Sequence, residues 1–348
     1  MELLPDSIPV VFLAAAVAAL YARVASSRLR PGLPRLTALL PVIAFLAVAP
    51  MSFSSPMVRG FSAFMLAWLG AFKVALLAAG RGPLDPALPV LPFVFTAALP
   101  VKLKRRHGDR PDAAAAATIM PSSRAKSVWL VSCAAKVAAI AAVVHLLQLK
   151  SLQLHLYVRL ALFGVHLYCF LDLVLPCMAA AGGALGMELE PQFDKPYLAS
   201  SLRDFWGRRW NLMASAILRP SVYDPVRARA GKAAGVFATF AVSGLMHEAI
   251  TWYLTLLPPT GETTAFFLLH GACCVAEGWC ARRWAERGSG WPPRPVATAL
   301  VAALVASTTF WLFFPPLYRG GAEEMLLKEY AALTAFVADA GRKMLRYG

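Results

Sequence analysis

Residues 237–254, FATFAVSGLMHEAITWYL, place two ionisable side chains inside a long apolar run. His247 and Glu248 lie near the middle of this run, and Ser243 and Gly244 lie one turn earlier. An ionisable group in such a segment is costly and is often functional. A neutral imidazole in apolar surroundings can act as a general base when a partner fixes its tautomer. His247 is therefore the first candidate for chemistry; the alternative is that it only hydrogen-bonds a neighbouring helix.

A second unusual segment is SLRDFWGRRWN, residues 201–211, which holds four charges, two tryptophans, a phenylalanine and an asparagine. Aromatic rings in such a segment suit the headgroup level of a bilayer, and arginines bind phosphate groups. The alternative is an interfacial anchor without a ligand. The candidates for contact with a phosphate-bearing substrate are Lys195, Arg203, Trp206, Arg208, Arg209 and Trp210, while Asn211 could orient an amide or a carbonyl group.

The other motifs are weaker signals. His166 and Asp172 are six residues apart and so do not stack on one helix face. His270 begins a turn with Gly271 and could contribute to a pocket, with simple packing as the alternative. The His-x4-Asp pattern at 107–112 lies in a basic, proline-broken loop without apolar flanks, so we interpret it as accidental. The sequence contains no His-His-x3-Asp-Gly, no Gly-x-Ser-x-Gly and no P-loop, which argues against three other classes of enzyme.

The composition is that of a membrane protein. Of the 348 residues, 59% are hydrophobic and only 15% are charged, whereas soluble domains carry about 25% charged residues. The net charge of +15 is explained by cationic loops beside anionic lipid headgroups, so membrane lipids rather than nucleic acid are the expected partners. The six cysteines include no Cys-x-x-Cys pair, and neither a zinc site nor a disulfide framework is indicated.

The apolar residues occur in blocks long enough to cross a bilayer as helices. We expect an all-α, multi-spanning protein in which residues 1–348 form a single membrane-embedded domain. The first block lacks a preceding basic region, which predicts a retained span rather than a cleaved signal. The predicted spans are residues 8–25, 36–54, 61–80, 127–149, 154–181, 233–257, 264–281 and 295–318.

Several segments between and after these spans are informative. Residues 82–100 carry five prolines, which predicts a re-entrant or broken segment. Residues 101–126 form a basic, alanine-rich loop, and residues 182–232 carry eight basic side chains against five acidic ones. The positive-inside rule places both, together with 26–35, on the cytoplasmic side and the N-terminus in the lumen. Residues 319–348 have apolar positions at helical spacing, which predicts an amphipathic helix at the interface.

The two polar motifs together resemble a known family. PQFDKPYLASSLRDFWGRRWN (191–211), followed by SGLMHE (243–248), is similar to the plant wax synthase family within the membrane-bound O-acyltransferase superfamily. FKVALLAAGRGPLDP (72–86) resembles another block of that family. The resemblance implies a multi-pass enzyme of the endoplasmic reticulum that joins an acyl-CoA to a long-chain alcohol, with no permanently bound cofactor. It carries the histidine of the superfamily onto His247 and its asparagine onto Asn211.

These residues suggest a reaction scheme. An alcohol is a poor nucleophile, so His247 would take its proton as it attacks the thioester carbonyl. Asn211 would hydrogen-bond the thioester region or the developing oxyanion. Ser243 and Glu248 are expected to line the same chamber. The CoA phosphates would be bound at the cytoplasmic face by Lys195, Arg203, Arg208 and Arg209.

Three alternatives remain open at this point. The same chemistry could act on a sterol or a diacylglycerol, because the motifs do not define the acceptor. A transporter would explain the proline-interrupted segment and the ionisable residues Lys73, Lys136 and Asp172 in apolar runs, although we find no second matching broken helix. A non-catalytic scaffold would have no need of His247 together with Asn211.

Overall fold

The computed structural model describes residues 7–101, 103, 123–149, 153–185, 187, 189–287 and 292–347. Eight of the helices are long and apolar enough to cross a membrane, which confirms the predicted all-α, multi-spanning fold. The described residues form no strand, only an isolated bridge between Leu103 and Leu189. The spans are Ile8–Arg28, Leu33–Ser52, Pro56–Ala78, Ser127–Gln148, Leu156–Ala184, Leu212–Thr255, Glu262–Glu286 and Arg294–Arg319.

The chain divides into two compact units, residues 1–102 with 191–348, and residues 103–190. The second unit contains α6 (Ser123–Gln148) and α7 (Leu156–Ala184). The N-terminal part of the first unit contains α1 (Ser7–Arg28), α2 (Leu33–Val48), η1 (Ala49–Ser52), α3 (Pro56–Ser62), η2 (Ala63–Gly70), α4 (Ala71–Ala78) and α5 (Val90–Ala98). Here η1 is a 3₁₀ helix, and η2 is a π-helical stretch that continues α3 into α4.

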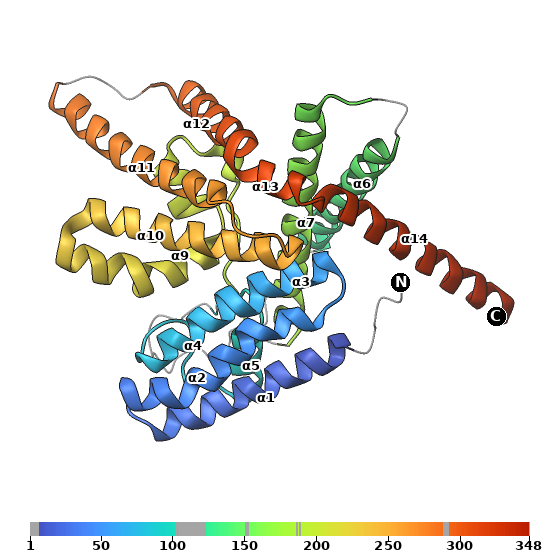
Figure 1. Ribbon diagram of the computed structural model, residues 1–348, viewed down its shortest axis with the longest axis horizontal. Coiled ribbons are helices and arrows are strands. Elements are labelled where there is room, and N and C mark those ends of the chain that lie inside the picture. The colour runs from blue at the N-terminus through green and yellow to red at the C-terminus, as the bar shows by residue number, and fades with distance from the viewer. Residues whose placement is uncertain are drawn as a thin grey trace. The chain divides into compact units, whose positions relative to one another are not determined.

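The C-terminal part of the first unit begins with short elements and continues with long helices (Figure 1). The short ones are η4 (Pro196–Leu198), α8 (Leu202–Asp204), η5 (Phe205–Arg209), α9 (Leu212–Leu218) and η6 (Arg219–Tyr223). The rest are α10 (Asp224–Thr255), α11 (Glu262–Glu286), α12 (Arg294–Thr308), η7 (Thr309–Phe313), α13 (Phe314–Arg319) and α14 (Ala322–Tyr347).

Helices α10 and α11 approach each other closely because α10 carries a glycine at the contact. A Cβ atom at Gly244 would lie 2.9 Å from the Cα atom of Thr264 on α11. One turn further along α10, a carboxylate oxygen of Glu248 accepts a hydrogen bond from the backbone N–H of Thr264 at 3.1 Å. This N–H lies in the first turn of α11, where backbone donors have no partner within the helix. Gly244 therefore makes room for a neighbouring backbone, and Glu248 caps that backbone.

The proline-rich segment 82–100 is broken, as predicted, and its only helix is the nine-residue α5. The Lys73 side chain on α4 is 0% exposed. Its ammonium group donates to the carbonyl oxygens of Thr96 at 2.7 Å and Leu99 at 2.6 Å. The Gln192 amide donates to the carbonyl oxygen of Pro100. These bonds satisfy backbone acceptors that irregular structure leaves free and that a membrane interior cannot solvate. Lys73 thus stabilises the end of α5.

In the second unit, α6 and α7 are joined by an ion pair. The Lys136 ammonium lies 2.9 Å from a carboxylate oxygen of Asp172 and also donates to the Asp172 carbonyl oxygen at 3.0 Å. Lys136 and Asp172 are therefore paired with each other, as charges inside membrane proteins generally are. The ionisable residues that suggested a transporter, Lys73, Lys136 and Asp172, thus all have structural partners.

Among the described contacts, the C-terminal helix α14 is held to the rest of the first unit through its first turns. Leu326 is buried, and a carboxylate oxygen of Glu329 accepts hydrogen bonds from the Ser55 hydroxyl at 2.8 Å and the Met57 backbone N–H at 3.2 Å. The Ser55 hydroxyl is the N-cap of α3, so α14 is held at the start of that helix. From residue 331 to 343 nearly every side chain is exposed.

The boundaries differ from the prediction at the starts of two helices. Helix α10 begins at Asp224, nine residues before the expected span at 233–257, and has a kink at Gly231, where φ is 85°. Helix α6 begins at Ser123 and so includes the end of the loop expected at 101–126. The rest of that loop, with its His-x4-Asp pattern, lies almost entirely outside the described residues.

Candidate active site

His247 has a defined tautomer. Its Nδ1 atom lies 2.7 Å from the backbone carbonyl oxygen of Ser243, one turn earlier on α10. A carbonyl oxygen only accepts hydrogen bonds, so Nδ1 must carry the proton and donate it. The neutral ring then keeps its lone pair on Nε2. Ser243 thus acts through its backbone, and the nitrogen left for chemistry is Nε2.

Aromatic rings surround the His247 imidazole. The Trp68 ring meets it edge-on at 5.0 Å between centroids, Phe267 lies at 4.3 Å, and Phe313 lies at 5.9 Å. We call these four residues the His247 ring cluster. They come from η2, α10, α11 and η7, which are far apart in the sequence. The imidazole is half-buried among apolar rings, an environment that excludes water from a reacting group.

Trp206 reaches this cluster through Phe267, with 5.6 Å between their ring centroids. Its indole N–H donates to Nδ1 of His270 at 2.9 Å. His270 is 1% exposed and lies inside α11, so the sequence prediction that it begins a turn with Gly271 is wrong. The helix continues through Gly271. A Cβ atom at this position would lie 3.0 Å from the Phe240 side chain, so the glycine allows α10 and α11 to pack closely.

The hydrogen bonds of His270 can be assigned a direction. An indole N–H only donates, so Nδ1 of His270 is the acceptor and Nε2 carries the proton. Nε2 lies 2.8 Å from the Thr308 hydroxyl, which in turn donates to the Leu304 carbonyl oxygen at 2.7 Å. Both ring nitrogens of His270 are therefore occupied. This histidine positions Trp206 and is unsuited to take a proton from a substrate.

Asn211 is the N-cap of α9. Its side-chain oxygen accepts from the backbone N–H of Ala214 at 3.1 Å, and its backbone is left-handed with φ at 43°. Asparagine is among the few residues other than glycine that tolerate this conformation. Because the oxygen must face the Ala214 donor, the NH₂ group points away from the helix end. The cap therefore leaves Asn211 with two amide donors for other partners.

Asn211 and His247 are related through a shared hydrophobic core. Ala214, three residues after Asn211, packs in one cluster with Trp68, and Met246 of α10 packs against that cluster. Trp68 is also in contact with the His247 ring. Among the described contacts, no hydrogen bond joins the Asn211 and His247 side chains directly. Trp68 thus contacts the His247 ring and shares a core with Ala214, the residue whose N–H Asn211 caps.

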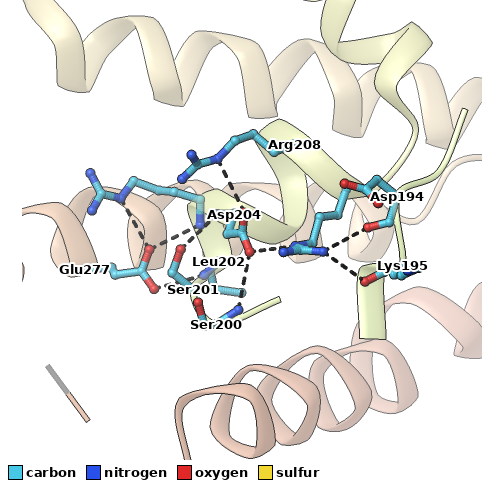
Figure 2. Close-up of polar contacts among 10 residues, drawn as sticks. Asp194, Lys195, Ser200, Ser201, Leu202, Asp204, Arg208 and Glu277 are labelled. Carbon is cyan, nitrogen blue, oxygen red and sulfur yellow. Dashed lines mark hydrogen bonds and ion pairs between the residues drawn. The ribbon is translucent and has the colours of Figure 1, made fainter. Parts of the chain in front are cut away.

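The two adjacent arginines differ in their environment. Both pair with Asp204, but Arg209 does so at 2.7 Å and Arg208 at 3.4 Å; Figure 2 shows the contact of Arg208 with Asp204. Arg209 also donates to the Asp194 carbonyl oxygen at 3.1 Å, and its side chain is 24% exposed against 77% for Arg208. The hydrogen bond to Asp204 raises the pKa of Arg209. Arg209 therefore holds the segment together, whereas the guanidinium of Arg208 is largely exposed.

Arg203 is also engaged within the protein. Its Nε lies 3.4 Å from a carboxylate oxygen of Glu277 on α11, and the same carboxylate accepts the Leu202 backbone N–H at 2.9 Å (Figure 2). Glu277 thereby ties the start of α8 to α11. Lys195 has a left-handed backbone with φ at 44°, and its side chain is exposed.

Trp210 belongs to the aromatic packing of the same segment. Its ring stacks on Phe205 at 5.5 Å with an interplanar angle of 13°, and it meets Phe193 edge-on at 5.1 Å. Trp206 meets Phe205 edge-on at 5.0 Å. The predicted site residues therefore fall into two groups. In the first, His247 belongs to the ring cluster, Ser243 fixes its tautomer, Trp206 contacts Phe267, and Asn211 caps Ala214 in the core that includes Trp68. In the second, Lys195, Arg203, Arg208 and Arg209 form a polar group around Asp204 and Glu277, and Glu248 separately caps α11.

The sequence analysis missed several residues of this site. Trp68, Phe267 and Phe313 lie in apolar runs, where an aromatic residue is no signal of function. Thr308 and Glu277 likewise have no motif around them. Only the contact with His247 or with the 201–211 segment distinguishes them. Within the described residues, His, Cys, Asp and Glu side chains nowhere form a group of three or more that could hold a metal ion.

A multi-span helical protein with a tautomer-defined histidine in an aromatic core, next to a segment of arginines and tryptophans, has the features of a membrane-bound acyltransferase. Comparison with known proteins agrees, since the profile of the "Membrane bound O-acyl transferase family" matches residues 189–269. That range contains Asn211 and His247.

Relatives align along almost the whole chain. Long-chain-alcohol O-fatty-acyltransferase of Simmondsia chinensis is 36% identical over 334 residues, 93% of this chain and 93% of the relative. Probable long-chain-alcohol O-fatty-acyltransferase 3 of Arabidopsis thaliana is 38% identical, covering 94% of each chain. Acyl-CoA–sterol O-acyltransferase 1 of Arabidopsis thaliana is 36% identical, covering 91% of this chain and 92% of the relative. The chain belongs to the plant wax synthase (long-chain-alcohol O-fatty-acyltransferase) family of membrane-bound O-acyltransferases.

Proposed function

We propose that this protein transfers an acyl group from acyl-CoA to a long-chain fatty alcohol, forming a wax ester and free CoA. The observation that carries the proposal is the His247 tautomer, with Nδ1–H bonded to Ser243 and the Nε2 lone pair left for a substrate. The choice of a fatty alcohol is supported by the names of the relatives from Simmondsia chinensis and Arabidopsis thaliana.

The reaction follows from these groups. The alcohol O–H donates its proton to Nε2 of His247 while its oxygen attacks the thioester carbonyl carbon. The carbonyl oxygen becomes an oxyanion, which the NH₂ group of Asn211 stabilises by hydrogen bonding. When the oxyanion collapses, the C–S bond breaks and the CoA thiolate leaves. The imidazolium returns its proton to that sulfur, so no acyl-enzyme forms and His247 is neutral again.

We assign the CoA head group to the polar group around Asp204. Lys195, Arg203 and Arg208 have exposed side chains in this group, and the ion pairs of Arg203 and Arg208 are long, at 3.4 Å, whereas Arg209 is held by Asp204 at 2.7 Å. The exposed cations are therefore the ones that can reach phosphates. Trp206 and Trp210 would pack beside the acyl-CoA, where the segment passes from polar to aromatic.

The location and domain organisation belong to the same proposal. We place the protein in the endoplasmic reticulum membrane, where acyl-CoA and long-chain alcohols are both at hand, with residues 182–232 facing the cytoplasm. Both compact units belong to one acyltransferase domain, which is supported by alignment of the relatives over nine tenths of the chain. The exposed part of α14 lies along the membrane surface.

A second candidate acceptor is a sterol. It is favoured by the relative named Acyl-CoA–sterol O-acyltransferase 1, which is as similar, at 36% identity, as the Simmondsia chinensis alcohol acyltransferase. The same base and oxyanion donors would serve a sterol hydroxyl. A diacylglycerol acceptor has no such support from the relatives named here.

One experiment separates the acceptors. The protein is expressed in a host that lacks neutral-lipid acyltransferases, and isolated membranes are given labelled acyl-CoA with hexadecanol, a sterol and diacylglycerol together. We expect wax ester as the main product. Sterol ester as the main product would replace the fatty alcohol by a sterol, and the absence of any ester would refute acyl transfer.

His247→Ala tests the mechanism in the same membranes. Loss of a general base should lower kcat by about 100-fold or more. Protein levels should be unchanged, because the side chain bonds only to its own helix and packs against rings. Near-normal turnover in this variant would remove His247 from the reaction.

A further inference from the structure

Trp68 holds a buried hydrogen-bond donor that has no partner. The residue is 2% exposed, and its indole N–H makes no hydrogen bond within the described structure. Trp206, the other tryptophan next to the ring cluster, donates its N–H to His270 at 2.9 Å. A buried N–H without an acceptor is destabilising, and buried polar groups in folded proteins are normally paired. The unpaired donor of Trp68 therefore calls for a functional explanation.

The position of Trp68 suggests that explanation. Its ring contacts the His247 imidazole edge-on, with centroids 5.0 Å apart and planes at 68°. It also packs in one core with Ala214, whose N–H is capped by Asn211. The unpaired donor thus belongs to a side chain that contacts the base and shares a core with Ala214, the residue capped by the proposed oxyanion donor Asn211.

The backbone around Trp68 is itself unusual. Residues Ala63–Gly70 form a π-helical stretch between α3 and α4. Such wide turns are rare within helices and occur frequently at functional sites, because they redirect side chains out of the regular helical spacing. Here the π-helical stretch carries the indole that faces His247. Two independent features, the orphan donor and the wide turn, therefore coincide at one residue.

We infer that Trp68 is a further catalytic residue, whose indole N–H donates a hydrogen bond to the acyl carbonyl oxygen of the bound thioester and to the oxyanion that forms from it. This inference rests on the proposed acyl transfer. An indole N–H only donates and does not ionise, so it can stabilise negative charge without exchanging a proton with His247. With Asn211 it forms a pair of neutral donors on the carbonyl oxygen, while Nε2 of His247 receives the alcohol proton.

A fixed, neutral hydrogen-bond donor at this position would stabilise the oxyanion. Hydrogen bonds to a developing oxyanion are worth most in a water-excluded environment, where the donor is held in place before the reaction. The Trp68 indole is held by its packing against Leu69, Met213 and Ile217, all buried in the same cluster. A bound carbonyl oxygen supplies the acceptor that the N–H lacks.

The test replaces the N–H and keeps the ring. Benzothienylalanine, in which sulfur takes the place of the indole N–H, is incorporated at Trp68, and the same replacement at Trp252 on α10 serves as the control. We expect kcat for ester formation to fall by about 100-fold at position 68, with the KM for acyl-CoA nearly unchanged, since the bond strengthens in the transition state. The control should match the unsubstituted protein.

The outcomes can be told apart. A kcat within about threefold of the unsubstituted protein would overturn the inference, because a single oxyanion donor typically contributes more than that. Trp68→Phe, made in parallel, tests packing; a loss with phenylalanine but not with benzothienylalanine would make Trp68 a packing residue only. Failure of the unsubstituted protein to form any ester would instead refute the proposed function.

Discussion

His247 and His270 lie on neighbouring helices, each in contact with aromatic rings, yet only His247 has a ring nitrogen without a hydrogen-bond partner among the described contacts. His247 donates from Nδ1 to a carbonyl of its own helix and keeps the lone pair of Nε2. His270 accepts the Trp206 N–H on Nδ1 and bonds Thr308 through Nε2. Proton transfer needs an unoccupied lone pair, so at the scale of single residues the hydrogen-bond partners distinguish a base from a positioning residue.

The double role of Asn211 makes two substitutions informative. Asn211→Asp keeps an oxygen that can cap α9, since aspartate caps helices as well as asparagine does. It replaces the NH₂ donor by a negative oxygen, so we expect kcat to fall by about 100- to 1,000-fold with membrane levels preserved. Asn211→Ala also loses the cap and should destabilise the protein by about 1 kcal/mol. Steady-state rates and thermal unfolding in detergent measure both effects.

The result for the aspartate variant decides the role of Asn211. If Asn211→Asp retained wild-type kcat, the residue would be a helix cap only. His247 and Trp68 would then remain as the candidates for direct contact with the reacting groups.

The substitutions Arg208→Gln and Arg209→Gln separate a role in acyl-CoA binding from a structural role. Arg208→Gln removes an exposed charge with one long contact to Asp204, so we expect a higher KM for acyl-CoA and little change in kcat or stability. Arg209→Gln breaks the short pair with Asp204 and the bond to the Asp194 carbonyl oxygen, so it should lower the protein level and unfolding temperature. Saturation curves and thermal scans on the same preparations compare the two. An unchanged KM in Arg208→Gln would make Arg208 a headgroup anchor.

At the scale of elements, α11 organises the site. Its Phe267 contacts His247, its His270 holds Trp206, and its Glu277 ties down the start of α8. The first turn of α11 is in turn capped by Glu248 of α10. One helix thus links the base to the 201–211 segment, which explains how residues about 40 positions apart in the sequence serve a single reaction.

The bond between His270 and Trp206 can be tested by graded replacement. His270→Gln keeps an acceptor for the indole and a donor for the Thr308 hydroxyl, whereas His270→Phe keeps a ring and loses both. We expect His270→Phe to destabilise the protein by about 1–3 kcal/mol, because the Trp206 N–H is left buried without a partner, and to lower kcat. His270→Gln should restore part of both quantities. Equal unfolding temperatures and rates in the two variants would contradict a positioning role.

At the scale of the whole molecule, eight spans form two compact units, and α14 extends beyond its contacts with α3 (Figure 1). Its outer half places Leu333 and Val337 on one face at helical spacing, both exposed. On the other side, Asp339 pairs with Lys343 at 3.0 Å and lies 3.8 Å from Arg342. A helix with this division of side chains is suited to lie in the membrane interface.

Thiol labelling tests this orientation of α14. In a background without the six native cysteines, Val337→Cys and Arg342→Cys are exposed to a membrane-impermeant maleimide on the cytoplasmic side. We expect Arg342→Cys to react and Val337→Cys to be protected until detergent is added, because the apolar face is buried in lipid. Equal labelling in intact membranes would show that the helix stands in water.

Several features were determined by the sequence alone. A chain segment that crosses a bilayer must satisfy its backbone polar groups internally, as a helix does, which is why eight helical spans could be predicted from long apolar blocks, with shifted boundaries for some of them. The proline density of 82–100 ruled out a regular helix, and the motifs around 201–211 and 243–248 indicated the family. Each of these depends on residues that are neighbours in the chain.

Other features depend on contacts between distant segments, and only the tertiary structure decided them. In the sequence, Lys73 is an ionisable residue in an apolar run with no evident partner. Only the fold shows that its ammonium group donates to carbonyl oxygens at the end of α5. The hydrogen bonds of His270, the difference between Arg208 and Arg209, and the orphan donor of Trp68 likewise have no local signal. Composition and spacing report which side chains are present, but whether a buried donor finds an acceptor is determined by how the helices pack.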